Sequence, residues 1–121
     1  MATTEPTDTT IHFLKKDGTI SNALCSIVKE IFVKYDMDKD GMLSKEELRH
    51  YFSTLNNERL EDPSLDLCMM IINGNTIGFT LDDFYKFYEF QSRFKPGETF
   101  SDLSKQYSQR TLLERLHVLE E

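Results

Sequence analysis

Residues 36–47 constrain this 121-residue chain more than any other segment. Their sequence, Asp-Met-Asp-Lys-Asp-Gly-Met-Leu-Ser-Lys-Glu-Glu, has carboxylates at positions 1, 3, 5 and 12 and a glycine at position 6. In a tightly wound loop alternate residues point inward, so Asp36, Asp38 and Asp40 can direct oxygens to one point. Gly41 allows a sharp turn with positive φ, and Glu47 is long enough to reach back with both oxygens. The spacing therefore predicts a site for one hard divalent cation.

Apolar residues at helical spacing flank this loop on both sides. The upstream stripe is Val28, Ile31, Phe32 and Tyr35, and the downstream stripe is Leu48, Tyr51, Phe52 and Leu55. Within the loop, Leu43 is placed to join a short β-bridge to a partner loop, and Ser44 with Glu47 forms the S-x-x-E pattern of a capping box. The agreement of loop and flanks argues against the alternative, a solvated acidic turn that binds nothing.

This helix–loop–helix pattern resembles the calcium-binding EF-hand, and residues 20–94 resemble a paired EF-hand domain of the calmodulin-like kind. The residues that the resemblance assigns to the ion are Asp36, Asp38, Asp40, Met42 through its backbone carbonyl, and Glu47. A bidentate glutamate favours Ca²⁺, because Mg²⁺ demands a smaller octahedral shell. Mg²⁺ is an alternative occupant at rest.

The pattern recurs further along the chain. Leu65, Cys68, Met69 and Ile72 match the upstream stripe, and Phe79, Phe84, Phe87 and Tyr88 match Leu43, Leu48, Tyr51 and Phe52. Residues 73–83 are therefore predicted to form a second loop, one residue shorter than the first. Asn73 and Asn75 replace two acids and Asp83 has a shorter arm than glutamate, so we expect no metal there. An unrelated helix-turn-helix is the alternative.

The predicted fold class is all-α: an EF-hand pair of four helices and two loops, joined by a short β-bridge, with an extra C-terminal helix. Residues 1–18 are expected to be a flexible N-terminal segment, in which residues 11–14 pack on the domain in extended form. The paired domain spans 19–94, with its halves at 20–57 and 63–94, and 95–121 form a helical extension. The first helix is predicted over about Thr19–Tyr35, and the third starts with Asp62 as its cap and Pro63 in its first turn.

The fourth helix, predicted over 81–94, is unusually aromatic. Phe84, Phe87, Tyr88 and Phe94 fit one face, whereas Tyr85 and Phe90 fall outside that stripe. One core face cannot absorb all these rings, so either another segment covers the remainder or they form a contact surface.

The extension has two apolar stripes. They are Phe100, Leu103 and Tyr107, then Leu112, Leu113, Leu116 and Leu119. A kink or restart is expected near 108–111, with Thr111 and Glu114 as a capping box. Three arrangements fit this segment: it folds back over the aromatic groove, it pairs with another copy in a dimer, or it docks on a partner.

Charge and residue usage exclude several classes. A net charge of −7 argues against nucleic acid, whose phosphates would repel the chain. Cys25 and Cys68 fall on apolar stripes, so buried free thiols are expected in preference to a disulfide. No signal peptide or membrane span is evident, which favours a cytoplasmic protein. His12, His50 and His117 lie far apart and no phosphate loop or nucleophile motif occurs, so an enzyme is not expected.

Two functions fit the sequence. The first is a calcium-responsive interaction module that binds one Ca²⁺ and then changes access to its aromatic surface, whose partner is an unidentified protein or peptide helix or the chain's own C-terminal helix. The second is a constitutive scaffold, in which the ion is structural and the aromatic face binds a partner at any calcium level.

Overall fold

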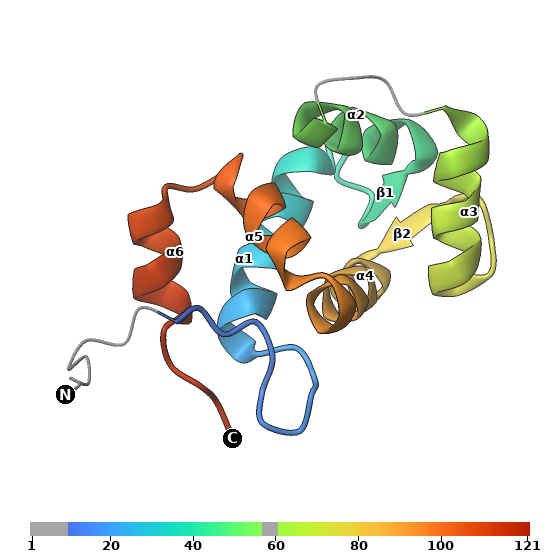
Figure 1. Cartoon of the computed structure of the whole chain (residues 1–121). Helices are drawn as coiled ribbons and strands as arrows, with labels where there is room; N and C mark the ends of the chain where they lie inside the picture. Colours follow the sequence, from blue (N-terminus) through green and yellow to red (C-terminus); the bar gives the residue numbers. More distant parts are fainter. Residues whose placement is uncertain (1–9, 57–60) are drawn as a thin grey trace, which may run out of the picture.

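The structure is a computed structural model that describes residues 10–56 and 61–121 (Figure 1). In chain order its elements are α1 (Asn22–Tyr35), β1 (Met42–Ser44), α2 (Lys45–Asn56), α3 (Asp62–Asn73), β2 (Gly78–Thr80), α4 (Leu81–Phe94), α5 (Pro96–Ser104) and α6 (Gln109–Leu116). The predicted pair of helix–loop–helix units with a C-terminal helical addition is confirmed. Within the described residues, no helix combines the length and the apolar character needed to cross a membrane.

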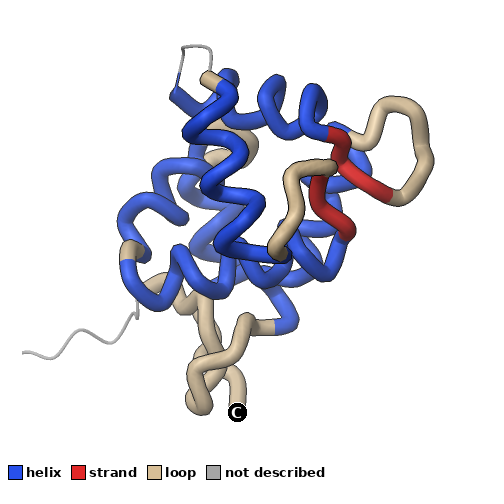
Figure 2. The backbone as a smooth tube through the Cα atoms, turned by 90° about the vertical axis from the view of Figure 1, so that its right-hand side faces the viewer, coloured by secondary structure: helices blue, strands red, loops and turns tan. Residues whose placement is uncertain are grey.

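The two halves meet at the predicted β-bridge. Strands β1 and β2 pair antiparallel and lie side by side in Figure 2. Leu43 lies opposite Phe79 in this pair, and both side chains are fully buried. A Cβ on Gly78 would lie 2.2 Å from the carbonyl oxygen of Leu43, so only glycine permits this close approach. The bridge places residues 36–47 (loop 1) beside residues 73–83 (loop 2).

Aromatic rings fill the core between the helices. Tyr51, Phe84 and Tyr88 are fully buried, and Phe84 meets the other two edge-on at centroid distances of 5.5 and 5.3 Å. Phe94, which was expected on the same stripe, is 64% exposed, so that assignment is wrong. It is the last residue of α4 and packs its ring on Phe90, which is itself half exposed.

The N-terminal boundary of α1 differs from the prediction. The helix begins at Asn22, with Ser21 as its cap, because Ile20 still pairs with Leu14 in an antiparallel bridge. Phe13 is buried in the core, as expected for an extended segment packed on the domain. Flexibility of residues 1–18 stays a prediction, and residues 1–9 lie outside the described part, as does residue 57, the predicted end of the first half.

The third helix begins one residue earlier than expected. Glu61 is the N-cap residue, and Asp62 lies in the first helical turn together with Pro63. Pro63 has the role assigned to it, because proline suits a position whose backbone amide has no helical acceptor.

Neither cysteine is fully buried, which corrects the expectation. Both are free thiols of intermediate exposure, because they lie at the edges of the apolar faces of α1 and α3. The partial burial of Cys68 still raises its pKa to about 11.

The C-terminal extension consists of two short helices instead of one. The predicted restart is present, but Ser108 is the N-cap of α6: its side chain accepts from the amide of Thr111, so the expected Thr111–Glu114 box is wrong. Because α6 ends at Leu116, Leu119 leaves the expected stripe and is 42% exposed.

This extension packs on its own chain, as in the fold-back arrangement. Helix α5 lies against α4 and α6 lies against α1 (Figure 1), and Leu103, Leu112 and Leu116 are buried in the common core. The carboxylate of Glu120 accepts from the backbone amides of Asn22 and Ala23 at 2.7 and 3.1 Å. A negative charge stabilises a helix N-terminus, so the C-terminal tail caps α1.

Candidate metal centre

Loop 1 is held at both ends by helices. Asp36 directly follows the last residue of α1 and donates its amide to the carbonyl of Phe32, and Glu47 lies in the first turn of α2. Gly41 has φ +82°, as the spacing predicted. Lys39 also adopts a left-handed conformation, with φ 57°, which the sequence did not indicate. These two residues turn the chain sharply enough to bring both ends of the loop together.

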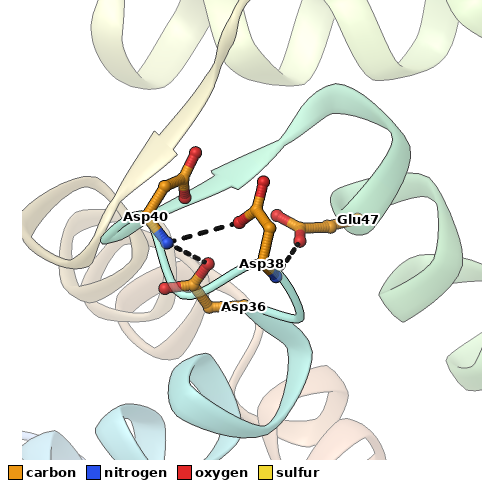
Figure 3. A group of neighbouring side chains, drawn as sticks. All are labelled: Asp36, Asp38, Asp40 and Glu47. Atoms are coloured by element: carbon orange, nitrogen blue, oxygen red, sulfur yellow. Dashed lines mark hydrogen bonds between the residues drawn. The ribbon is translucent and has the colours of Figure 1, made fainter.

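The four predicted carboxylates face one another across this turn (Figure 3). One oxygen from each of Asp36, Asp38, Asp40 and Glu47 lies within 4.8 Å of the others. Asp36 and Glu47 are 8% and 7% exposed, whereas Asp38 and Asp40 are open to solvent. Two carboxylates of the cluster are therefore buried, and the other two are accessible to solvent.

Backbone amides orient the two sheltered carboxylates. Glu47 accepts from the amides of Met37 and Ser44, both at 2.9 Å, and Ser44 Oγ accepts from the amide of Glu47 at 3.1 Å. The last two contacts are the capping box that the sequence predicted. Asp36 accepts from the amide of Gly41 at 2.9 Å.

The close approach of like charges changes the acidity of the loop. Partial desolvation opposes ionisation of Asp36, but hydrogen bonds, first from the Gly41 amide, hold its pKa below the ordinary value. Desolvation and contacts with the carboxyls of Asp40 and Asp36 raise the pKa of Asp38. Repulsion among ionised carboxylates is the condition that a bound cation relieves.

The donor set fits a hard divalent cation. Carboxylate oxygens are the ligands that Ca²⁺ and Mg²⁺ prefer, and the cluster contains no sulfur or imidazole ligand. Asp36, Asp38, Asp40 and Glu47 would hold the ion. The part assigned to the carbonyl of Met42 stays a prediction.

Loop 2 is closed by an amide. Asn73 Nδ2 donates to the carbonyl of Gly78 at 2.8 Å and to Asp83 Oδ2 at 2.9 Å. The Asn73 and Asn75 oxygens accept from the backbone amides of Asn75 and Ile77, both at 2.9 Å. The first and last residues of the loop, Asn73 and Asp83, are thus joined directly by an N–H donor. A cation between them would require oxygen acceptors from both residues.

A chain of hydroxyl contacts, which no sequence pattern indicated, links both halves of the pair to the extension. Tyr51 OH contacts Tyr88 OH, and Tyr88 OH donates to Asp102 Oδ2 at 3.3 Å. Burial raises the pKa of Asp102, although hydrogen bonds from Gln91 and Tyr88 oppose this. Asp102 lies in α5, outside any recognisable pattern.

A second missed contact joins α2 to α3, and we call it the α2–α3 clamp. Lys45 Nζ lies 2.7 Å from Asp66 Oδ1, and Arg49 pairs with Asp62. Arg49 is 5% exposed and therefore sheltered, whereas the side chain of Lys45 is 29% exposed. The signal was present in the sequence: two bases spaced four apart open one helix, and two acids spaced four apart open the next.

Comparison with known proteins identifies the first half of the pair. Residues 27–55 match the family model described as EF hand domain, and this segment contains all of loop 1. No curated protein and no solved structure matches the chain.

Proposed function

Because the chain belongs to the EF-hand superfamily, we propose that loop 1 binds one Ca²⁺ per chain and that the protein is a calcium-responsive interaction module. The convergence of four carboxylates in a loop between two helices carries the proposal. Bound Ca²⁺ would supply the positive charge that offsets repulsion among them.

Helix α2 is the element that would transmit the response. Its first turn contains Lys45 of the clamp to α3 and Glu47, whose oxygens accept from loop amides. Arg49, the other base of the clamp, follows directly in the next turn. One turn later, Tyr51 contacts Tyr88 and so reaches α5. A change in the contacts of Glu47 therefore acts on a helix that touches both α3 and, through Tyr88, the extension.

The constitutive scaffold is the second candidate, and loop 2 favours it. Since an amide closes loop 2, the second half of the pair has its structure without an ion of its own. In this case calcium would order loop 1 alone and leave the helices where they are.

Calorimetry tests calcium binding. We expect one site per chain without cooperativity, with affinity in the sensor range of about 10⁻⁷–10⁻⁵ M. Glu47→Gln should weaken it by about tenfold or more, because a bidentate anion becomes a neutral amide. Glu114→Gln makes the same change of charge on an exposed face of α6 and should have no effect. Two coupled sites, or unchanged binding in Glu47→Gln, would contradict the proposal.

Amide NMR spectra recorded with calcium and with chelator separate the two candidates. A responsive module should show shifts in loop 1, in α2 and in the residues of α3 and α5 that α2 reaches. Shifts confined to residues 36–47 would favour the scaffold. A parallel titration with Mg²⁺ reports whether that ion competes for loop 1.

A further inference from the structure

Loop 2 contains the only Asn–Gly pair of the chain. Asn73 is the last residue of α3, and Gly74 follows it as the C-cap residue with φ 77°. In such a pair the backbone nitrogen of the glycine can attack the side-chain carbonyl carbon of the asparagine, because no Cβ on the glycine hinders the approach. Every other asparagine of the chain precedes a residue that has a Cβ. Asn73 is therefore the asparagine at which this reaction is least hindered.

The reaction replaces the side-chain amide by a carboxylate. Solvent base removes the proton of the Gly74 amide, the Gly74 nitrogen forms a bond to Cγ of Asn73, and the Cγ–Nδ2 bond breaks. Nδ2 takes up a proton from solvent and leaves as ammonia, so a five-membered succinimide ring remains. Water then adds to either ring carbonyl and opens the ring, which gives aspartate or isoaspartate. Overall, water is consumed and ammonia is released, and no further reactant is required.

The closed form of loop 2 opposes this reaction. Asn73 has a helical backbone, which turns the Gly74 nitrogen away from Cγ, and the Gly74 amide donates to the carbonyl of Met70 at 3.1 Å. The leaving nitrogen, Nδ2, is held by its hydrogen bonds to the Gly78 carbonyl and the Asp83 carboxylate. Because ring closure needs the two reacting atoms in contact, the pair is protected while these bonds persist.

Local opening of loop 2 would remove the protection. Gly74 is exposed and Asn73 is partly exposed, so base and water have access to the pair as soon as its hydrogen bonds break. Only the three-residue strand β2 ties this loop to loop 1, and a short segment of this kind opens at a lower free energy than the whole domain. After the reaction, an ionised carboxylate at position 73 cannot donate to Gly78 or Asp83, and it repels the Asp83 carboxylate.

We propose that Asn73 is a site of spontaneous deamidation, that the closed loop 2 suppresses the reaction, and that the product prevents the loop from closing as before. Opening of the loop thus leads to a covalent change that the chain itself cannot reverse. This inference goes beyond the calcium role and does not depend on it, because every step takes place in loop 2 and requires only water.

Peptide mapping by mass spectrometry tests the site. The full chain is incubated at neutral pH with chelator, either folded or in urea, and aspartate and isoaspartate are measured at each asparagine. In urea, Asn73 should react faster than Asn75, its comparator in the same loop. In the folded chain, Asn73 should react at least about tenfold more slowly than in urea. Equal rates in the two conditions, or a faster reaction at Asn75 in urea, would overturn the proposal.

The decisive variant is Asp83→Ala, which removes one acceptor of Nδ2 and leaves the Asn73–Gly74 pair intact. A reaction that requires an open form follows the population of that form, so the folded variant should deamidate about tenfold faster than the wild type. Asp82→Ala removes the same charge at an exposed neighbouring position and should leave the rate unchanged. In urea both variants should react at the wild-type rate.

The opposite results are equally clear. A slower reaction in folded Asp83→Ala would mean that its carboxylate promotes deamidation, and an unchanged rate would mean that the Asn73–Asp83 bond gives no protection; either result refutes the proposal. Asp83→Asn, which retains an acceptor oxygen without the charge, provides a second variant if the first does not fold. It should accelerate the reaction by about threefold, and no acceleration would contradict the same argument.

The product tests the last part of the proposal. Its added negative charge separates the deamidated chain from the unreacted chain by anion exchange. Amide hydrogen exchange across residues 73–83 should then be at least about tenfold faster in the deamidated fraction, because the loop has lost the bonds that closed it. Equal exchange in the two fractions would show that the product closes the loop as before and would overturn that part.

Discussion

Replacing Asn73 by aspartate should destabilise the protein although it makes loop 2 look more like a calcium loop. The Asn73 amide donates two hydrogen bonds, to the Gly78 carbonyl and the Asp83 carboxylate, and an ionised aspartate can donate neither. The first bond contributes about 1 kcal/mol and the bond to a charged group about 1.5–3 kcal/mol. Two carboxylates about 2.9 Å apart also repel by about 1.4 kcal/mol in water, less in salt.

Both side chains are partly exposed, so the lower part of these ranges applies. We expect a loss of about 3 kcal/mol in the free energy of unfolding, which lowers Tm by about 10 °C for a domain of this size. Urea unfolding at neutral pH with chelator present measures the loss directly. Asn75→Asp is the matched control, because it adds the same charge to the same loop. The Asn75 side chain accepts from the backbone amide of Ile77, and an aspartate can accept this hydrogen bond equally well.

The pH dependence gives a second check. Desolvation acts to raise the pKa of Asp83, but hydrogen bonds from Asn73 and Thr80 outweigh it, so the pKa of Asp83 is lowered in the folded state. When the pKa of a carboxylate is lower in the folded state than in the unfolded state, its ionised form stabilises the fold. This stabilisation is fully present above the unfolded-state pKa of about 3.9, and it is lost as the pH falls through the folded-state pKa. The difference between wild type and Asn73→Asp should therefore shrink below about pH 4. Equal stability of Asn73→Asp and Asn75→Asp at neutral pH would refute the amide-closure argument.

Two further perturbations probe the bridge and the extension. Gly78→Ala should lower the free energy of unfolding by about 2–3 kcal/mol, because the new Cβ would meet the Leu43 carbonyl. The control is Gly97→Ala in α5, whose Cβ would meet no atom within 4 Å and which should change stability by less than about 1 kcal/mol. Thermal unfolding compares the two variants, and equal effects would contradict the contact. Burial, then the hydrogen bond to Glu30, raises the pKa of Tyr107 to about 12, so its contribution to stability is complete below about pH 10 and is lost as the pH rises through 12. In Glu30→Gln, NMR titration of the tyrosine rings should show this pKa lowered, and an unchanged value would leave burial as the cause.

Loop 1 could be predicted from sequence because its information is local. The ligand spacing, Gly41 and the capping box of Ser44 with Glu47 are all set within residues 36–47, and the structure brings the four carboxylates together as expected. The second half followed from the repeat, since Leu43 and Phe79 occupy equivalent positions and pair in the bridge.

The individual contacts of the extension could not be predicted, because they join residues far apart in the chain. Glu120 caps α1 and Asp102 completes a hydroxyl chain from Tyr51, yet neither residue belongs to a local pattern. The error at Phe94 has a similar origin: periodicity places it on the face of Tyr88, but α4 ends there and the chain turns into α5. Helical spacing predicts the direction in which a side chain points, but it does not predict whether other elements extend far enough along the helix to bury that side chain.

The division between the two halves follows from what closes each loop. Loop 1 brings four carboxylates together, whereas the ends of loop 2 are joined by a hydrogen bond from the Asn73 amide to the Asp83 carboxylate, so under our proposal a cation acts on loop 1 alone. A ligand shifts an equilibrium only by its differential affinity for the two states, so calcium can alter the second half only through elements that span both halves. Those elements include the β-bridge, the α2–α3 clamp and the contact between Tyr51 and Tyr88. Because coupling is reciprocal, any partner of the second half that prefers the calcium-bound arrangement must tighten calcium binding in loop 1 by the same factor.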